Sequence, residues 1–200
     1  WVNKLEPPSS SNGFGHSVAI SGNYVVVGSV YIDTAFMFER TDQGVWTAGT
    51  VLTSSDYVVN SGNYFGVSVA ISGTYVVIGA DSNSIDDNDD ITHEGAAYVF
   101  ERNATTGVWV ETTKLVASDA YHRDFMGGSV AISGNYVVVG AKWEDEDAEG
   151  VYHNLSGSAY VFERNESTGA WTETTKLKAL SPGDIDQFGI SVGISGDHIV

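Results

Sequence analysis

Two acidic segments place oxygen-bearing side chains at a spacing that suits a calcium ion. The first supplies positions 1, 3 and 5 of a curled loop, with Gly150 at position 6, from Asp145, Asp147 and Glu149. The second has Ile91 where a glycine is wanted and supplies positions 1, 3, 5 and 9 from Asp86, Asn88, Asp90 and Glu94. Calcium takes about six to eight oxygens, and alternate side chains converge on one point when the backbone curls. The spacing therefore predicts a calcium site, best matched in the first segment; the alternative is a solvated acidic loop.

Signals for catalysis are weak. The chain has no cysteine, and its five histidines are scattered without the paired spacing of a zinc site. The triplet His122-Arg123-Asp124 resembles a kinase catalytic sequence but lacks the asparagine that should follow it. The many carboxylates single out no pair for glycoside hydrolysis. We therefore predict a protein that is not an enzyme.

Three N-x-Ser/Thr sequons could accept a glycan, at Asn103, Asn154 and Asn165. Asn103 and Asn165 fall at equivalent expected hairpin tips, where asparagine and threonine are also simply good turn residues. For partner binding we select Trp143, which lies outside the pattern of the other tryptophans, because exposed tryptophan is enriched at recognition sites. Tyr121 and Asp124, in a polar linker on the same expected face, complete the predicted partner-binding set.

Composition limits the class of partner. The 200 residues include 26 acidic and 9 basic ones, giving a formal net charge of −17. Without a basic stripe to neutralise phosphates, nucleic acid is excluded as a partner. No apolar run approaches the ~20 residues that span a bilayer. The hydrophobic content of 42% is nevertheless high enough for a folded core.

The elements that position these residues come from an internal repeat. Ser-Val-Ala-Ile-Ser-Gly occurs at 17–22, 68–73 and 129–134 and returns with one change at 191–196. Each unit holds four short runs rich in valine, isoleucine and aromatic residues, separated by glycine, asparagine and serine, which predicts four antiparallel strands. The first run alternates with small residues, the next two are almost continuously apolar, and the fourth is polar at alternate positions. This gradient favours an all-β fold of propeller blades over its rival, a parallel β-helix.

We divide the chain accordingly into complete blades at 14–52, 65–115 and 126–177. Residues 1–5 are expected to be the last strand of a preceding blade, and 188–200 the first strands of a further one. The expectation is an incomplete β-propeller, about three full blades plus flanking strands of a larger one. An open array is the lesser alternative.

The repeated sequence resembles a known family at these positions. Phe-Gly-x-Ser-Val-Ala-Ile-Ser-Gly, as at 65–73, followed by an apolar run ending in Gly-Ala at 79–80 and Gly-Ala-Ala-Tyr-Val-Phe at 95–100, is similar to the FG-GAP repeat. That repeat also builds the propeller of integrin α subunits, and the likeness is greatest to the form found in extracellular microbial and algal proteins. The resemblance implies an extracellular or cell-surface propeller for adhesion, ligand recognition or scaffolding, often with calcium in its loops. One departure is that the integrin calcium loop joins the first and second strands, where this chain has only a short Ser-Gly-Asn turn.

The prediction is a non-enzymatic extracellular adhesion or structural module that binds a protein or glycan partner through an acidic loop face, with calcium as the candidate ion to order that face. An alternative is an accessory propeller of a larger secreted hydrolase. Another is a building block of an extracellular filament, in which neighbouring copies pack end to end.

Overall fold

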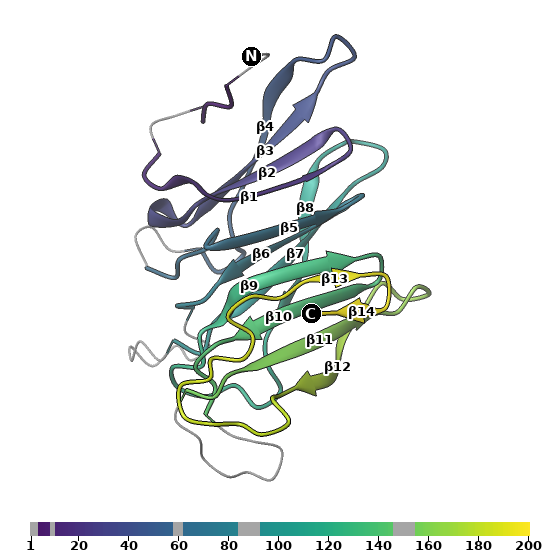
Figure 1. Ribbon diagram of the computed structural model, residues 1–200. Helices are drawn as coiled ribbons and strands as arrows, with labels where there is room; N and C mark the ends of the chain where they lie inside the picture. The colour runs from purple at the N-terminus through teal and green to yellow at the C-terminus, as the bar shows by residue number, and fades with distance from the viewer. Residues whose placement is uncertain (1–3, 9–10, 58–61, 84–92, 146–154) are drawn as a thin grey trace.

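The computed structural model describes residues 4–8, 11–57, 62–83, 93–145 and 155–200, and it is all-β apart from one short 3-10 turn, η1 (Val30–Ile32). Three four-stranded antiparallel sheets follow one another along the chain, and a two-stranded hairpin ends it (Figure 1). The first sheet contains β1 (Phe14–Ser21), β2 (Tyr24–Ser29), β3 (Thr34–Arg40) and β4 (Trp46–Leu52). The second contains β5 (Ser68–Ser72), β6 (Tyr75–Ala80), β7 (Ala96–Arg102) and β8 (Trp109–Leu115). The third contains β9 (Met126–Ser133), β10 (Tyr136–Ala141), β11 (Ser158–Arg164) and β12 (Trp171–Leu177), and the hairpin is β13 (Ile194–Ser195) with β14 (His198–Ile199).

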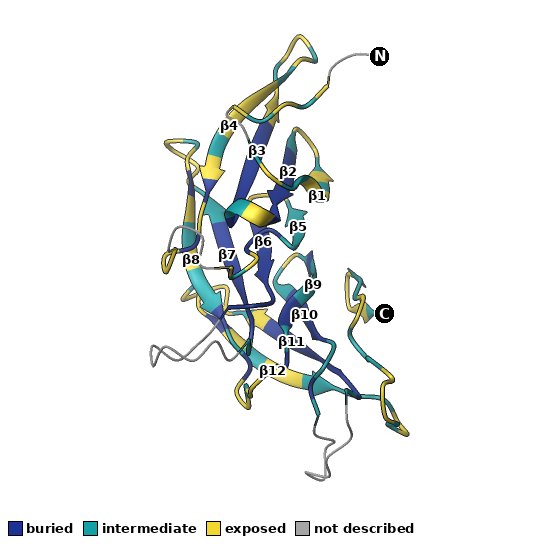
Figure 2. Cartoon of the chain, turned by 90° about the vertical axis from the view of Figure 1, so that its left-hand side faces the viewer, coloured by how far each residue is buried: buried dark blue, intermediate teal, exposed yellow. Residues whose placement is uncertain are grey.

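The predicted gradient of polarity across each sheet is confirmed. In all three sheets the second and third strands are buried over most of their length, because they are covered on both faces (Figure 2). The outer strands β4, β8 and β12 contain both exposed and covered positions and are less buried than the middle strands. β-branched and aromatic side chains fill the buried strands, which suits a pleated surface packed on both sides.

The sheets stack face to face, and the main hydrophobic cores lie between them. Between the first two sheets, Met37 and Leu52 pack with Phe65, Tyr98 and other buried side chains of the second. The same positions of the second and third sheets form the next core, which includes Leu115 and Tyr160. The inner strands β1, β5 and β9 lie near one another, while the outer strands spread along an arc (Figure 2). This arrangement is that of consecutive blades in an incomplete propeller.

A serine and two glycines fasten each pair of neighbouring sheets. Ser68 Oγ on β5 donates a hydrogen bond to the carbonyl oxygen of Gly127 on the third sheet, at 2.7 Å. Gly79 on β6 faces the same carbonyl so closely that a Cβ on it would lie 2.9 Å from the carbonyl carbon and would overlap the oxygen. The contact is repeated by Ser17 with Gly66 at 2.8 Å and by Ser129 with Gly189 at 2.7 Å. The Ser-Val-Ala-Ile-Ser motif and the Phe-Gly pair therefore recur because they build the joints between sheets.

A second repeated contact clamps the outer part of each interface. The guanidinium carbon of Arg102 lies 5.1 Å from the ring centroid of Tyr24, and Trp109 meets the same ring edge-on at 5.6 Å. In the next interface, Arg164 and Trp171 make the same two contacts with the ring of Tyr75. The repeated tryptophans Trp109 and Trp171 thus pack against the neighbouring sheet.

One further feature concerns the start of the chain, and another concerns membrane-spanning helices. Of residues 1–5, expected to form a last strand, 1–3 lie outside the described residues, and Leu5 packs against the first sheet. In the described part of the chain no helix has the length and apolar character needed to cross a membrane.

Candidate functional site

The connections between strands lie on two opposite edges of the stack. One edge, here called the turn edge, carries the short hairpin turns at 22–23, 41–45, 73–74, 103–108, 134–135 and 165–170. The other, here called the loop edge, carries the connections 30–33, 53–67, 81–95, 116–125, 142–157 and 178–193 (Figure 1). Because every sheet is an antiparallel meander, the connection after its second strand and the linker to the next sheet begin at the same edge.

Charge is concentrated in the connections of the loop edge. By sequence they contain 17 of the 26 acidic residues of the chain and three of its nine basic residues, and ten of these 17 are among the residues that the structure describes. Exposed tyrosines accompany the carboxylates: Tyr31 is 65% exposed, Tyr64 43% and Tyr121 75%. An excess of one sign of charge on one side of a molecule attracts partners of the opposite sign, and tyrosine supplies contact area at little cost in side-chain entropy.

Partly exposed ion pairs, each bonded to a buried tyrosine, hold the sheet linkers in place at this edge. In the linker after the first sheet, Asp56 accepts hydrogen bonds from Tyr98 Oη at 2.8 Å and from Lys114 Nζ at 2.7 Å. In the linker after the second sheet, Asp119 does the same with Tyr160 and Lys176, at 2.8 and 2.6 Å. Burial of the phenols, together with the adjacent carboxylates, raises the pKa of both tyrosines far above the ordinary value. These tyrosines therefore act as neutral hydrogen-bond donors and not as acids.

Trp143, a predicted partner-binding residue, is part of a packed aromatic cluster. Its ring meets Phe125 edge-on with centroids 4.6 Å apart, and His93 stacks on Phe125 at 5.3 Å. Lys142 Nζ lies 5.7 Å from the Trp143 ring centroid and forms an ion pair with Asp81 at 3.3 Å. Trp143 Nε1 is buried and has no hydrogen-bond partner in the described part of the chain. Trp143 is therefore half-buried against the junction between the second and third sheets and is less open to a partner than Tyr121.

The other two residues of the predicted partner-binding set differ in accessibility. Tyr121 projects from the linker, and its backbone N–H donates to Asp124 Oδ2 at 2.7 Å. Asp124 is only 4% exposed, so its carboxyl is occupied with this turn and a partner on the surface would meet Tyr121 instead. Burial, together with the nearby Glu144 and Asp119 carboxylates, raises the pKa of Asp124 to about 7, although the Tyr121 N–H bond opposes the shift.

Most of the predicted calcium ligands lie outside the described residues, namely Asp86, Asn88, Asp90, Asp147 and Glu149. Asp145 is described, and its Oδ1 accepts the backbone N–H of Leu155 at 2.6 Å. Glu94 is half-buried, and its backbone oxygen accepts the N–H of Met126. Within the described ranges, no three histidine or acidic side chains gather in a way that could hold a metal ion. Since Asp145 alone does not supply the oxygens that calcium needs, calcium binding stays a prediction.

Two of the predicted sequons sit at exposed hairpin tips on the turn edge. Asn103 Oδ1 accepts the backbone N–H groups of Thr105 and Thr106, both at 2.9 Å. Asn165 makes the same pair of contacts at 3.0 Å with the two residues at the matching positions. These contacts account for asparagine as a turn residue and leave glycosylation a prediction. Asn154 lies outside the described residues.

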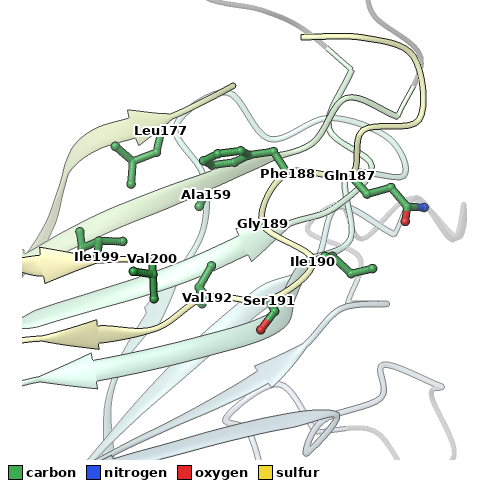
Figure 3. A pocket seen from close by; sticks show the side chains of 10 residues that line it. All are labelled: Ala159, Leu177, Gln187, Phe188, Gly189, Ile190, Ser191, Val192, Ile199 and Val200. Atoms are coloured by element: carbon green, nitrogen blue, oxygen red, sulfur yellow. The ribbon is translucent and has the colours of Figure 1, made fainter. Parts of the chain in front are cut away.

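An apolar pocket of about 390 Å³ lies between the third sheet and the terminal hairpin (Figure 3). Ala159, Leu177 and Phe188 line it, together with Ile199 and Val200 of the hairpin region. At the junction between the first two sheets, the positions equivalent to Ala159 and Leu177 pack against aromatic side chains of the following third strand. The pocket is thus an open part of an inter-sheet interface and lacks the convergent polar groups of a small-molecule site.

Reasoning from the sequence missed several residues of the loop edge. The buried Glu144 beside Lys176, the His93–Phe125 stack and the exposed Tyr31 and Tyr64 were not selected. Extending the repeat alignment beyond its apolar motif pairs Asn83 with Glu144 and Asn63 with Asp124, and this signal was available in the sequence.

Comparison with solved structures finds the same kind of fold. Sqt1 of Saccharomyces cerevisiae aligns with a TM-score of 0.53 at 11% identity, over 86% of this chain and 38% of Sqt1. The computationally designed protein Ika4 aligns with a TM-score of 0.51 at 16% identity, over 97% of this chain and 87% of Ika4. At these identities the likeness is one of fold alone. A comparison with curated proteins finds no match.

The FG-GAP repeat family matches residues 7–44, 46–100 and 109–162. The three matched stretches contain the serine–glycine joints and the paired valine-rich strands that make each sheet and fasten it to the next. Both the repeated sequence and the contacts it makes therefore place the chain in the FG-GAP repeat family.

Proposed function

We propose that this chain is a non-enzymatic extracellular module that binds a protein or glycan partner through its loop edge. The observation that carries the proposal is the concentration of 17 of 26 acidic residues, ten of them among the described residues, in the connections of one edge that also carries exposed tyrosines. The interior and the turn edge are occupied by contacts that repeat from sheet to sheet. A surface that differs between repeats is where a specific partner can be recognised.

The charge of the loop edge favours a partner with a positively charged surface. Carboxylates steer such a partner toward the edge, and this contribution weakens as salt screens it. Tyr31 and Tyr121 would then provide the contacts that persist at higher salt, because aromatic side chains contribute most of the energy at many interfaces. Extracellular placement is part of the proposal and is supported by the membership of the FG-GAP family.

The test measures binding to defined probes, a glycan array and immobilised poly-L-lysine, with loop-edge and control variants. We expect Tyr31→Ala/Tyr121→Ala to weaken binding to whichever probe the wild type binds by tenfold or more, an order-of-magnitude figure for two interface aromatics. The control, Val108→Ala/Val110→Ala, truncates side chains that are 48% and 53% exposed on and beside the outer strand β8. Equal loss in both variants, or no binding to either probe by the wild type, would count against the proposal.

A second candidate function, end-to-end packing with neighbouring copies, is supported by the outer face of the first sheet. Val18 and Ile20 are 65% and 63% exposed there, whereas Ile132, at the position of Ile20 in the third sheet, is buried against the second sheet. The apolar pocket leaves the opposite end of the stack partly open as well (Figure 3). Sedimentation velocity over a range of concentrations tests this candidate: Val18→Asp/Ile20→Asp should abolish association, and a wild type that stays monomeric at every concentration would exclude it.

A further inference from the structure

The two junctions between complete sheets are built from the same positions, which allows them to be compared directly. In each, a linker aspartate accepts a hydrogen bond from a buried tyrosine and forms an ion pair with a lysine near the end of the outer strand. The first junction uses Asp56, Tyr98 and Lys114, and the second uses Asp119, Tyr160 and Lys176. Because these three contacts are the same in both junctions, the remaining residues show how the junctions differ.

The first difference is the second partner of the lysine. Lys114 Nζ donates to the neutral amide oxygen of Asn83 at 2.8 Å, whereas Lys176 Nζ forms an ion pair with Glu144 at 2.8 Å. Glu144 is 4% exposed, and its other oxygen accepts a hydrogen bond from Ser158 Oγ at 2.6 Å. The second junction thus holds two carboxylates against one ammonium group where the first holds one.

The second difference adds a third carboxyl group. Asp124 and Asn63 occupy matching places, because each lies three residues before the glycine of its joint, Gly127 and Gly66 respectively. The backbone oxygen of Asp124 accepts the N–H of Trp143 at 3.4 Å, as that of Asn63 accepts the N–H of Ser82 at 3.3 Å. The Asp124 side chain is buried and accepts the Tyr121 N–H, so the turn 121–124 closes on this carboxyl.

The groups that face Asp124 do not balance its negative charge. Asp119 lies in the same linker and Glu144 in the connection after β10, and both disfavour ionisation of Asp124. From β12, Lys176 favours it but is already paired with those two carboxylates at 2.6 and 2.8 Å. Lys178, just beyond β12, has its own pKa lowered by burial and by Lys176. An unbalanced buried carboxyl group retains its proton to a higher pH than an exposed one.

We propose that the junction between the second and third sheets is a proton-dependent joint, in which protonated Asp124 keeps the turn 121–124 buried in the junction and ionised Asp124 loosens it. Ionisation places a third negative charge in a site with one closely held cation, so water must enter to solvate it. The turn that carries the exposed Tyr121 is then firmly packed at mildly acidic pH and looser above neutral pH. The first junction, with asparagine at both variable positions, lacks this response.

The sign of the effect follows from proton linkage. The raised pKa, about 7 against an ordinary value of 3.8, means that the folded chain keeps a proton that the unfolded chain has already released. Stability from this group is therefore complete below the ordinary value and is lost as pH rises toward the folded value. A difference of about three units sets an upper limit of about a thousandfold on the change in the unfolding equilibrium constant.

The experiment compares urea unfolding at pH 5 and pH 8 for the wild type and Asp124→Asn, which installs the residue found in the first junction. We expect the wild type to lose stability between these pH values relative to Asp124→Asn, by up to about a hundredfold in the unfolding equilibrium constant, because the unfolded chain has already released most of this proton at pH 5. The control Asp42→Asn removes an exposed carboxylate from the turn edge and should behave like the wild type. The same pH dependence in wild type and Asp124→Asn would overturn the proposal.

A direct titration covers the case in which Asp124→Asn fails to fold. The carboxyl carbon of Asp124 in the wild type, followed by carbon-13 NMR, should titrate well above the ordinary value. In Glu144→Gln the midpoint should move down, because one neighbouring negative charge is gone, and a merely structural role for Asp124 would not produce that movement. A wild-type midpoint near 4, the ordinary aspartate range, would overturn the proposal by itself.

Discussion

Replacement of Gly79 by alanine tests whether the sheets are held together by close backbone approach. The added Cβ would lie 2.9 Å from the carbonyl carbon of Gly127, and closer still to its oxygen, with the Ser68 hydroxyl also in the way. Carbon atoms pack best at about 3.5–4.0 Å, so the second and third sheets would have to separate at this point by at least about 0.6 Å. Neither obstacle is the flexible end of a long side chain. Relief therefore requires movement of the backbone.

The energetic cost has two parts. Forcing an extra carbon into a packed interface costs about 1–3 kcal/mol. Separation also weakens the 2.7 Å bond from Ser68 to the Gly127 carbonyl, and leaving that acceptor without its partner costs about another 1–3 kcal/mol. We expect Gly79→Ala to lower the free energy of unfolding by about 2–6 kcal/mol, a large share of the ~5–15 kcal/mol typical of a folded protein.

The assay is urea unfolding, followed by tryptophan fluorescence and by circular dichroism. Gly128→Ala is the matched control, because the nearest atoms to its added Cβ lie at 3.6 Å, which is an ordinary contact. Ser68→Ala separates the two parts, since it removes the hydrogen bond without adding a carbon. If Gly79→Ala and Gly128→Ala unfold at the same urea concentration, the close approach does not hold the sheets together and the reasoning fails.

Three further predictions use the same unfolding assay or calorimetry. Trp171→Ala should cost about 3–5 kcal/mol, since the ring is buried against the neighbouring sheet, and Trp46→Ala on the outer face of the first sheet should cost less. Tyr98→Phe should cost about 1–3 kcal/mol, because its hydroxyl bonds a linker carboxylate that would lose a donor, and a cost near zero would show that water replaces it. For calcium, titration calorimetry at millimolar concentration should give heat with the wild type and none with Asp145→Ala/Asp147→Ala; no heat with the wild type removes the metal prediction.

The fold was predictable because each repeat contains the same sequence signals for strands and turns. Val-Val-Val or Val-Val-Ile runs flanked by Ser-Gly turns specify strands, and their recurrence at 24–27, 75–78 and 136–139 makes an accidental pattern implausible. The gradient from small to apolar to polar residues fixed which strands lie inside. What periodicity could not supply was the partner of each repeated residue. That Ser68 bonds Gly127, 59 residues away, depends on how two sheets stack.

The candidate site was less predictable, for a different physical reason. Loop residues are placed by individual contacts and not by a repeating preference, so nothing in the sequence showed that Tyr121 projects while Asp124, three residues later, is buried. The choice of Trp143 rested on its departure from the repeat, and the structure packs it against Phe125 instead of leaving it free. Departure from a repeat thus identified a place where the junctions differ, but did not show how far its side chain is exposed.

The comparison of the two junctions locates where this chain can carry a specific function. The serine–glycine joint and the tyrosine–arginine–tryptophan clamp are the same in both junctions. They hold the sheets together but do not make one junction chemically different from the other. The first junction has Asn63 and Asn83 where the second has Asp124 and Glu144, and the middle strands of both sheets keep the same pairing register. Exchanging these pairs should therefore transfer the pH response from the second junction to the first while both sheets stay folded. If the exchange instead disrupts the sheets, these four positions are required for folding, and their variation does not support a functional role for the loop edge.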